Sequence, residues 1–319
     1  MQAHNRVEHF PVAFFATVMG MAGLAIAWEK GRHVLGLDWP VGEVLVGVVA
    51  LQLAVVLGLF LLKVLRYPQA VMEDLRHPAK LSFFPTISIN LLLLAIGLLP
   101  WAPEAARGLW IAGAALHLVF TLYVMNVWIH HTHFEVHHLS PAWYIPVVGN
   151  VLVPVAGVPL GYLEVSWFFF SIGMVFWLVL LTIIFYRVLF HQPLPERLMP
   201  TLFILIAPPA VGFIAYFKLS GGLDPFGRVL YGAALFLALL LLVQIRRFAR
   251  LQFFLSWWAY SFPLAAMTIA SLVMYEATGL AGYRAIGLGL LALTTAVVLL
   301  LLVRTAGAIR QYRICVPEG

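Results

Sequence analysis

Residues 257–276 read WWAYSFPLAAMTIASLVMYE, a largely apolar stretch that contains Pro263. A helix needs about 20 mostly apolar residues to cross a bilayer. Lipid offers no partner to backbone N–H and C=O groups, so a crossing segment is expected to be helical. The stretch therefore predicts a membrane-spanning helix with a proline inside it, and the rest of the chain can be compared with this pattern.

The whole chain has the composition of a polytopic membrane protein. Of its 319 residues, 63% are hydrophobic and 10% are charged, whereas soluble domains have roughly 45–50% apolar and 25% charged residues. The mean hydropathy is +0.99. We predict an all-α integral membrane protein that forms a single transmembrane domain over residues 1–319. Its ten spans are expected at about 10–28, 41–65, 81–101, 107–129, 142–160, 163–190, 198–219, 226–247, 251–276 and 280–309.

Proline divides these spans into two alternating classes. The even-numbered spans contain no proline, whereas the odd-numbered spans contain or begin with Pro11, Pro85, Pro146, Pro154, Pro159, Pro208, Pro209 and Pro263. Proline removes a helix hydrogen bond, and in membranes broken helices persist where protein or a water-filled cavity satisfies the freed groups. We therefore predict five helical hairpins, with the proline-kinked odd helices as an inner ring around a pore and the even helices as a lipid-facing outer ring.

Small and polar residues of the odd spans add detail to this prediction. Gly20, Gly149 and Gly212 are expected to allow close backbone approach in the inner ring. The middles of these spans hold no acid or base, only Thr17, Thr86, Ser88, Asn90, Asn150, Thr268 and Ser271. An intramembrane acid or base is the usual sign of a proton relay or ion-coupled site. We therefore expect a pathway lined by apolar groups, hydroxyls and amides.

The basic residues predict the orientation of the chain. The formal net charge is +6, and 13 of the 19 Lys and Arg residues fall on the side of the N-terminus, among them Arg246, Arg247 and Arg250. Cytoplasmic loops carry the excess of Lys and Arg in membrane proteins. We therefore predict a bacterial-type inner (plasma) membrane protein with both termini in the cytoplasm. The positive charge then needs no nucleic-acid partner to explain it.

Five of the chain's 11 histidines lie in HHTHFEVHH, residues 130–138. Imidazole suits iron, and membrane oxygenases hold their irons with runs of this shape. The other histidines are scattered and form no second box, so we expect a solvated cytoplasmic loop and no metal or cofactor. A cytoplasmic metal or pH sensor stays as an alternative, because histidine titrates near physiological pH.

Five segments resemble the odd helices of the family that joins plant slow anion channels and the bacterial tellurite-resistance protein TehA. The segments are HFPVAFFATVMGMAGLAIAW, LSFFPTISINLLLLAIG, SPAWYIPVVGN, LMPTLFILIAPPAVGF and WWAYSFPLAAMTIASLVMYE. The resemblance implies ten helices in five hairpins, a homotrimer with one pore in each subunit, and passive conduction of small anions rather than catalysis. It also implies that Phe262 corresponds to a ninth-helix phenylalanine that closes the pore.

These observations lead to a functional expectation. Phe262 precedes Pro263, and a residue before proline is biased away from α geometry, which can aim the ring into a narrow lumen. The proline and glycine positions named above are expected to kink or line the pore. We expect a largely uncharged pore for nitrate, chloride and iodide. The alternative is a secondary transporter or exporter of dicarboxylate, sulfite or tellurite-type oxyanions, which the family's range of names also includes.

Overall fold

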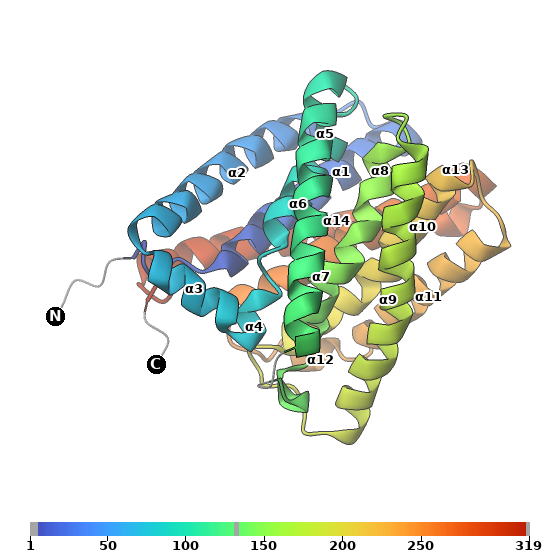
Figure 1. Ribbon diagram of the computed structural model, residues 1–319. Helices are drawn as coiled ribbons and strands as arrows, with labels where there is room; N and C mark the ends of the chain where they lie inside the picture. Colours follow the sequence, from blue (N-terminus) through green and yellow to red (C-terminus); the bar gives the residue numbers. More distant parts are fainter. Residues whose placement is uncertain (1–5, 131–133, 317–319) are drawn as a thin grey trace.

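The computed structural model describes residues 6–130 and 134–316, and this part of the chain is built from helices without any strand (Figure 1). Nine helices of the described residues are long and apolar enough to cross a membrane. A shorter apolar helical stretch, Pro141–Gly157, takes the place of the predicted fifth span. The predicted all-α membrane fold is therefore confirmed.

The helices form two concentric sets. The inner set consists of α1 (Phe15–Leu35), α5 (Thr86–Leu98), α7 (Tyr144–Val148) with α8 (Val153–Gly157), α10 (Ala207–Leu219) and α13 (Ser261–Thr278). The outer set consists of α2 (Val41–Arg66), α6 (Pro103–His130), α9 (Leu163–Phe190), α11 (Pro225–Leu242) and α14 (Ala281–Arg310). Inner and outer helices alternate along the chain, so each consecutive pair forms a hairpin.

The inner helices close into a ring. Helix α1 packs on α5, α5 on α8, α8 on α10, α10 on α13, and α13 returns to α1. Each outer helix packs on the inner helix of its own hairpin and on one neighbouring inner helix, as α2 does on α1 and α5. The four long inner spans bury 67–78% of their most apolar stretch, and the five outer spans bury only 28–39%. The predicted inner and outer rings are therefore confirmed.

Each inner segment is interrupted before its main α-helix begins. The preceding pieces are η1 (Val12–Phe14), α4 (Pro78–Leu81), η4 (Gly149–Leu152), η5 (Met199–Ile206) and η6 (Leu255–Tyr260). Pro85 caps α5, Pro154 and Pro208 are the second residues of α8 and α10, and Pro263 is the third residue of α13. Proline is tolerated in the first helical turn because its missing N–H would be unpaired there. The prolines thus mark where an α-helix restarts, instead of kinking the middle of a continuous helix.

The fifth segment differs most from the prediction. Residues 142–160 were expected to form one helix, but they fall into η3 (Pro141–Trp143), α7, η4 and α8, none longer than five residues. In one continuous helix over 142–160, Pro146 and Pro154 would each remove a hydrogen bond, so the helix ends and restarts instead. The carbonyl oxygen of Pro146 accepts a hydrogen bond from Thr121 of α6 at 2.7 Å, so a neighbouring helix replaces a bond that a regular helix would have supplied.

Polar side chains satisfy carbonyl groups at all five interruptions. A hydroxyl or amide donates to the carbonyl three residues earlier in the pairs Thr17–Phe14, Thr86–Phe83, Asn150–Val147, Thr201–Leu198 and Ser261–Trp258, at 2.5–2.8 Å. Irregular backbone at membrane depth requires such partners, because lipid supplies none. The repeated contact explains why polar residues occur in otherwise apolar inner segments.

Short helices cover the end of the molecule at which the inner segments begin. They include α3 (Pro68–Arg76), α12 (Ile245–Phe248) and η2 (Val136–His138). Arg6 donates to the carbonyl oxygen of Ile309 at 3.3 Å, and its guanidinium lies 5.0 Å from the ring centre of Tyr312, so both described ends of the chain meet here. We call this end, which carries Arg6, α3, α12 and residues 311–316, the basic end.

Candidate functional site

A cavity of about 1040 Å³ lies at the basic end. Its walls are residues of η1, α4, η5 and η6, the first turns of α5, α10 and α13, the end of α14, and the segment after α14 up to Val316. We call this cavity the vestibule. Because the starts of the inner segments form its wall, the vestibule lies at the mouth of the inner ring.

The vestibule is electropositive. Lys80, Arg197, Arg304 and Arg313 line it together with His9 and His77, and none of the described lining residues is Asp or Glu. A concave wall that carries one sign of charge raises the local concentration of counter-ions. The vestibule is therefore suited to gather anions.

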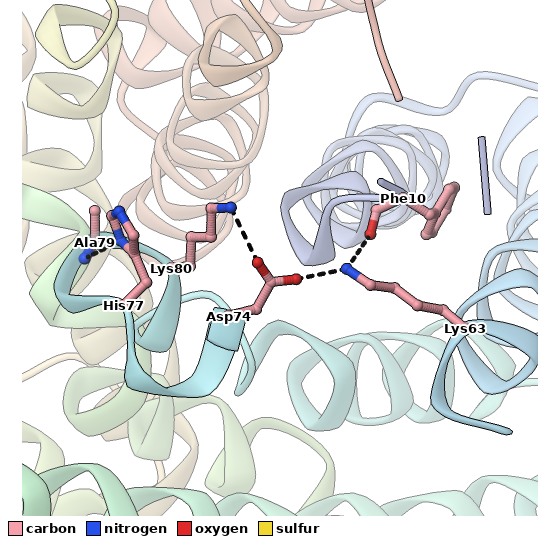
Figure 2. Close-up of polar contacts among 6 residues, drawn as sticks. All are labelled: Phe10, Lys63, Asp74, His77, Ala79 and Lys80. Atoms are coloured by element: carbon pink, nitrogen blue, oxygen red, sulfur yellow. Dashed lines mark hydrogen bonds and ion pairs between the residues drawn. The ribbon is translucent and has the colours of Figure 1, made fainter. Parts of the chain in front are cut away.

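Lys80 is held in place by a carboxylate outside the vestibule. Figure 2 shows Asp74 of α3 between Lys63 and Lys80, with Nζ–O distances of 2.5 and 3.0 Å, while Lys63 also donates to the carbonyl oxygen of Phe10 at 3.1 Å. Lys63 and Asp74 are 2% and 8% exposed. The network ties the end of α2, helix α3 and the start of the first inner segment together beside the vestibule.

A second, smaller cavity of about 50 Å³ lies deeper in the inner ring. It is lined by apolar residues and Tyr144, and none of its described lining residues is charged. The two cavities share the lining residues Met19, Ile145, Ile204, Ala207 and Phe262. These five residues therefore lie where the vestibule and what we call the inner cavity adjoin, and we call them the partition.

Phe262 reaches this partition because of how α13 begins. It is the second residue of the helix, directly after η6 and before Pro263, and it is half-buried. Its ring lies against Gly23 of α1, where an added Cβ would stand 3.2 Å from Phe262 Cδ2 and 2.9 Å from Ala265 Cβ. The glycine thus provides the space in which the Phe262 ring packs against the wall of the ring of helices.

The other predicted site residues occupy several kinds of position. Pro263 lines the vestibule, and Pro208 and Gly149 line the inner cavity. The remaining ones lie outside the lining of both cavities: Pro85, Pro146, Pro154, Pro209, Gly20 and Gly212. Of the two glycines, Gly20 packs against Ser261 and Trp258, and Gly212 packs against Met174 of α9. The structure thus places these glycines at helix–helix contacts.

The polar residues expected along the pathway are mostly elsewhere. Of the seven hydroxyl and amide residues named from the sequence, only Thr86 lines a cavity. Asn90 instead donates to the carbonyl oxygen of Phe15 at 2.9 Å, and Thr268 donates to that of Leu264 at 2.8 Å. These residues mostly serve as internal hydrogen-bond donors of the broken helices, and the hydroxyl and amide residues in the lining of the vestibule are Thr86, Thr201, Gln252, Ser256 and Gln311.

His117 is a buried residue near the site that the sequence reading did not single out. It belongs to the outer helix α6, is completely buried, and its Nδ1 lies 2.9 Å from Ser88 Oγ. A Cβ added to Gly149, which lines the inner cavity, would stand 2.7 Å from His117 Nε2. A histidine in the middle of the predicted span 107–129 was the available signal, since ionisable groups inside membrane spans are rare.

The histidine-rich stretch 130–138 lies at the end of α6, and its residues 131–133 are outside the described part of the chain. His137 Nδ1 lies 3.1 Å from Glu135 Oε2. Partial burial and the adjacent His137 lower the pKa of His138. Within the residues that the structure describes, no group of three or more His, Cys, Asp or Glu could hold a metal ion. The pH or metal sensor stays a prediction.

Comparison with known proteins gives several relatives. The chain is 30% identical to the S-type anion channel SLAH2 of Arabidopsis thaliana over 281 residues, which are 85% of this chain and 54% of the plant protein. It is 27% identical to the tellurite resistance protein TehA homolog of Haemophilus influenzae over 276 residues, covering 85% and 83% of the two chains. It is also 27% identical to the uncharacterized transporter MJ0762 of Methanocaldococcus jannaschii over 308 residues, covering 89% and 90%.

The family comparison agrees with the helical architecture. The chain spans only about half the length of the plant channels SLAH2 and SLAH3, at 54% and 42%. The family model described as voltage-dependent anion channel matches residues 9–306, which include all five helical hairpins. The chain therefore belongs to the voltage-dependent anion channel (SLAC1) family of multi-pass membrane proteins.

Proposed function

We propose that the protein is a passive channel for small monovalent anions and that Phe262 is its gate. The position of Phe262 in the partition between the two cavities carries this proposal. An anion collected in the vestibule would have to pass this ring to reach the inner cavity. Membership of an anion channel family supports the same function.

The lining of the inner cavity supports a specific order of permeability. Its described lining residues include no charged group, so no fixed cation there replaces the hydration that an anion loses. Burial of an unpaired charge is costly, and the cost is lower for ions that dehydrate easily. We expect nitrate and iodide to pass more readily than chloride, and sulfate or malate to pass poorly. Ion substitution in planar bilayers measures this order as shifts in reversal potential.

The substitution Phe262→Ala tests the gate. Removing the ring should raise single-channel conductance strongly in planar bilayers, with little loss of thermal stability, because the half-buried ring borders open space on two sides. Phe213→Ala is the control, since Phe213 is completely buried and lines neither cavity. The control should cost about 3–5 kcal/mol of stability and leave the conductance unchanged.

Two results would contradict the proposal. A Phe262→Ala protein that is destabilised like Phe213→Ala, with no added current, would identify Phe262 as an ordinary packing residue. Saturable flux that follows the gradient of a coupled ion would indicate a secondary transporter of dicarboxylate, sulfite or tellurite-type oxyanions, because a channel current scales with the driving force.

We further propose a homotrimer in a bacterial-type inner membrane, with a separate pore in each subunit and both termini in the cytoplasm. A separate pore is supported by the closed inner ring of one chain, which surrounds the partition without a second copy. The mass of the detergent-purified protein, corrected for bound detergent, measures the number of subunits. A monomeric or dimeric mass would contradict the trimer and leave the single-chain pore untouched.

A further inference from the structure

The vestibule is larger than the proposed transport of small anions requires. Its volume of about 1040 Å³ corresponds to the upper end of the roughly 300–1,000 Å³ found for pockets that bind drug-sized molecules. The inner cavity beyond the partition holds only about 50 Å³. An anion that fills much of the vestibule is therefore too large for the inner cavity and would stop at Phe262.

Three arginines give the vestibule a lining that fits a multivalent anion. Arg197 precedes η5, Arg304 belongs to α14, and Arg313 follows α14, so three separate segments bring them to one cavity. None of their guanidinium groups forms an ion pair or hydrogen bond with another residue that the structure describes. Lys80 differs, because Asp74 already holds it.

Guanidinium groups have a specific preference among anions. The planar fork of N–H donors matches two oxygens of one phosphate or carboxylate, and such bonds are stronger than neutral hydrogen bonds. An oligophosphate carries several charged phosphate groups in a row, so it can pair with guanidinium groups that lie farther apart than the oxygens of a single small anion.

We propose that the vestibule is a binding site for a multivalent oligophosphate anion, held by Arg197, Arg304 and Arg313, and that the bound anion blocks the way to Phe262. The blocking effect rests on the proposed channel function, whereas the binding does not. The competing interpretation is that the arginines only concentrate small anions. The two differ in whether tripolyphosphate binds at a saturable site.

Cys315 permits a binding test that does not depend on conduction. It is the single cysteine of the sequence, and it lines the vestibule. Burial raises the pKa of its thiol, so labelling of the purified protein with N-ethylmaleimide is followed at mildly alkaline pH. Tripolyphosphate should slow the labelling severalfold with a saturable concentration dependence, and sodium chloride of equal ionic strength should not.

Matched variants identify the groups that bind. Arg304→Gln should raise the tripolyphosphate concentration that halves the labelling rate of Cys315 by about tenfold or more, since the substitution removes charge-assisted hydrogen bonds to the anion. Arg246→Gln is the control, because Arg246 of α12 is an exposed arginine at the same end that does not line the vestibule. This variant should behave like the unmodified protein. The proposed binding site would be overturned if both substitutions changed this concentration equally, or if tripolyphosphate did not slow the labelling of Cys315 at all.

Current recordings test the block in bilayers of phosphatidylcholine alone. Tripolyphosphate added on the side of the basic end should reduce the current of the Phe262→Ala channel, and addition on the other side should not. Slower labelling of Cys315 without a reduced current would overturn the blocking role.

The outcomes also separate binding from conduction. If tripolyphosphate slows the labelling of Cys315 but no variant conducts an anion, the channel function is refuted and the binding site stays intact. Protection by phosphatidylglycerol vesicles but not by tripolyphosphate would assign the site to lipid phosphates and overturn the soluble ligand.

Discussion

Asp74 is a buried carboxylate that accepts from two lysines. Lys63 and Lys80 approach it at 2.5 and 3.0 Å, and Lys63 is almost completely buried. A buried charge is costly unless it is paired and hydrogen-bonded. Asp74 therefore supplies the carboxylate that pairs with Lys63 inside the protein.

The substitution Asp74→Asn should be strongly destabilising. It leaves the ammonium group of Lys63 without a carboxylate, and breaking a buried pair in this way costs about 3–5 kcal/mol. Thermal unfolding in detergent measures the loss. Glu104→Gln is the control, because its pair with Arg107 at 2.9 Å is exposed and such pairs contribute about 0–1 kcal/mol. Similar losses in the two variants would show that Lys63 does not depend on Asp74.

At the scale of helices, the contact between α1 and α13 depends on Gly20. A Cβ added there would lie 2.2 Å from Ser261 Oγ and 2.8 Å from the Trp258 ring. Both distances are too short for real contacts, so one of the two helices would have to shift. Ser261 is also the donor to Trp258 at the interruption before α13, so such a shift would disturb the restart of this helix.

The substitution Gly20→Ala should lower stability by about 1–3 kcal/mol, the usual cost of overpacking a filled core. Gly47→Ala is the matched control on α2, where an added Cβ meets no heavy atom within 4 Å. Alanine favours helix more than glycine does, so the control should be neutral or stabilising by up to about 1 kcal/mol. Unfolding curves that show no difference between the two variants would mean that the α1–α13 contact can relax without loss.

The sequence predicted the ring of helices because proline and composition act locally. The alternation of proline in the predicted spans separated α1, α5, α10 and α13 from the outer helices, although two outer helices, α6 and α11, begin with Pro103 and Pro225 in the structure. It could not predict the four pieces in residues 141–157, because the donor to Pro146 comes from Thr121 on another helix. It also ended the first span near residue 28, whereas α1 continues to Leu35. A charged residue such as Lys30 usually indicates the end of an apolar span. Here Lys30 lies inside α1, where its ammonium group pairs with Glu276 of α13 at 2.5 Å.

The candidate site was predictable only in part. Phe262 was singled out through Pro263 and the family resemblance, and its role as the gate stays a prediction. The vestibule could not be predicted, because Arg197, Arg304 and Arg313 are separated by long stretches of sequence and meet only after the ring has closed. Gly23, which makes room for the Phe262 ring, lies in the first odd-numbered span, where small residues are expected to allow close backbone approach, but the sequence does not show which side chain it faces.

At the scale of the whole molecule, the single cysteine can test the proposed orientation. Cys315 lines the vestibule at the basic end, where most Lys and Arg residues were expected on the cytoplasmic side. A membrane-impermeant thiol reagent should label Cys315 in inside-out vesicles and leave it unlabelled in intact spheroplasts. Cys315→Ser provides the background signal. Labelling from the outside would reverse the orientation, and the vestibule would then face the external medium.

The inner ring is sealed where its first and last members, α1 and α13, meet. Residues 15–35 leave the ribosome long before residues 261–278, so the face of α1 around Gly20 must wait for its partner during synthesis. Until then the first four hairpins form an open arc, with Phe262 not yet in place. A chain truncated before Leu255 would therefore lack the helix that closes the ring and, on the proposed channel function, would have no complete pore wall.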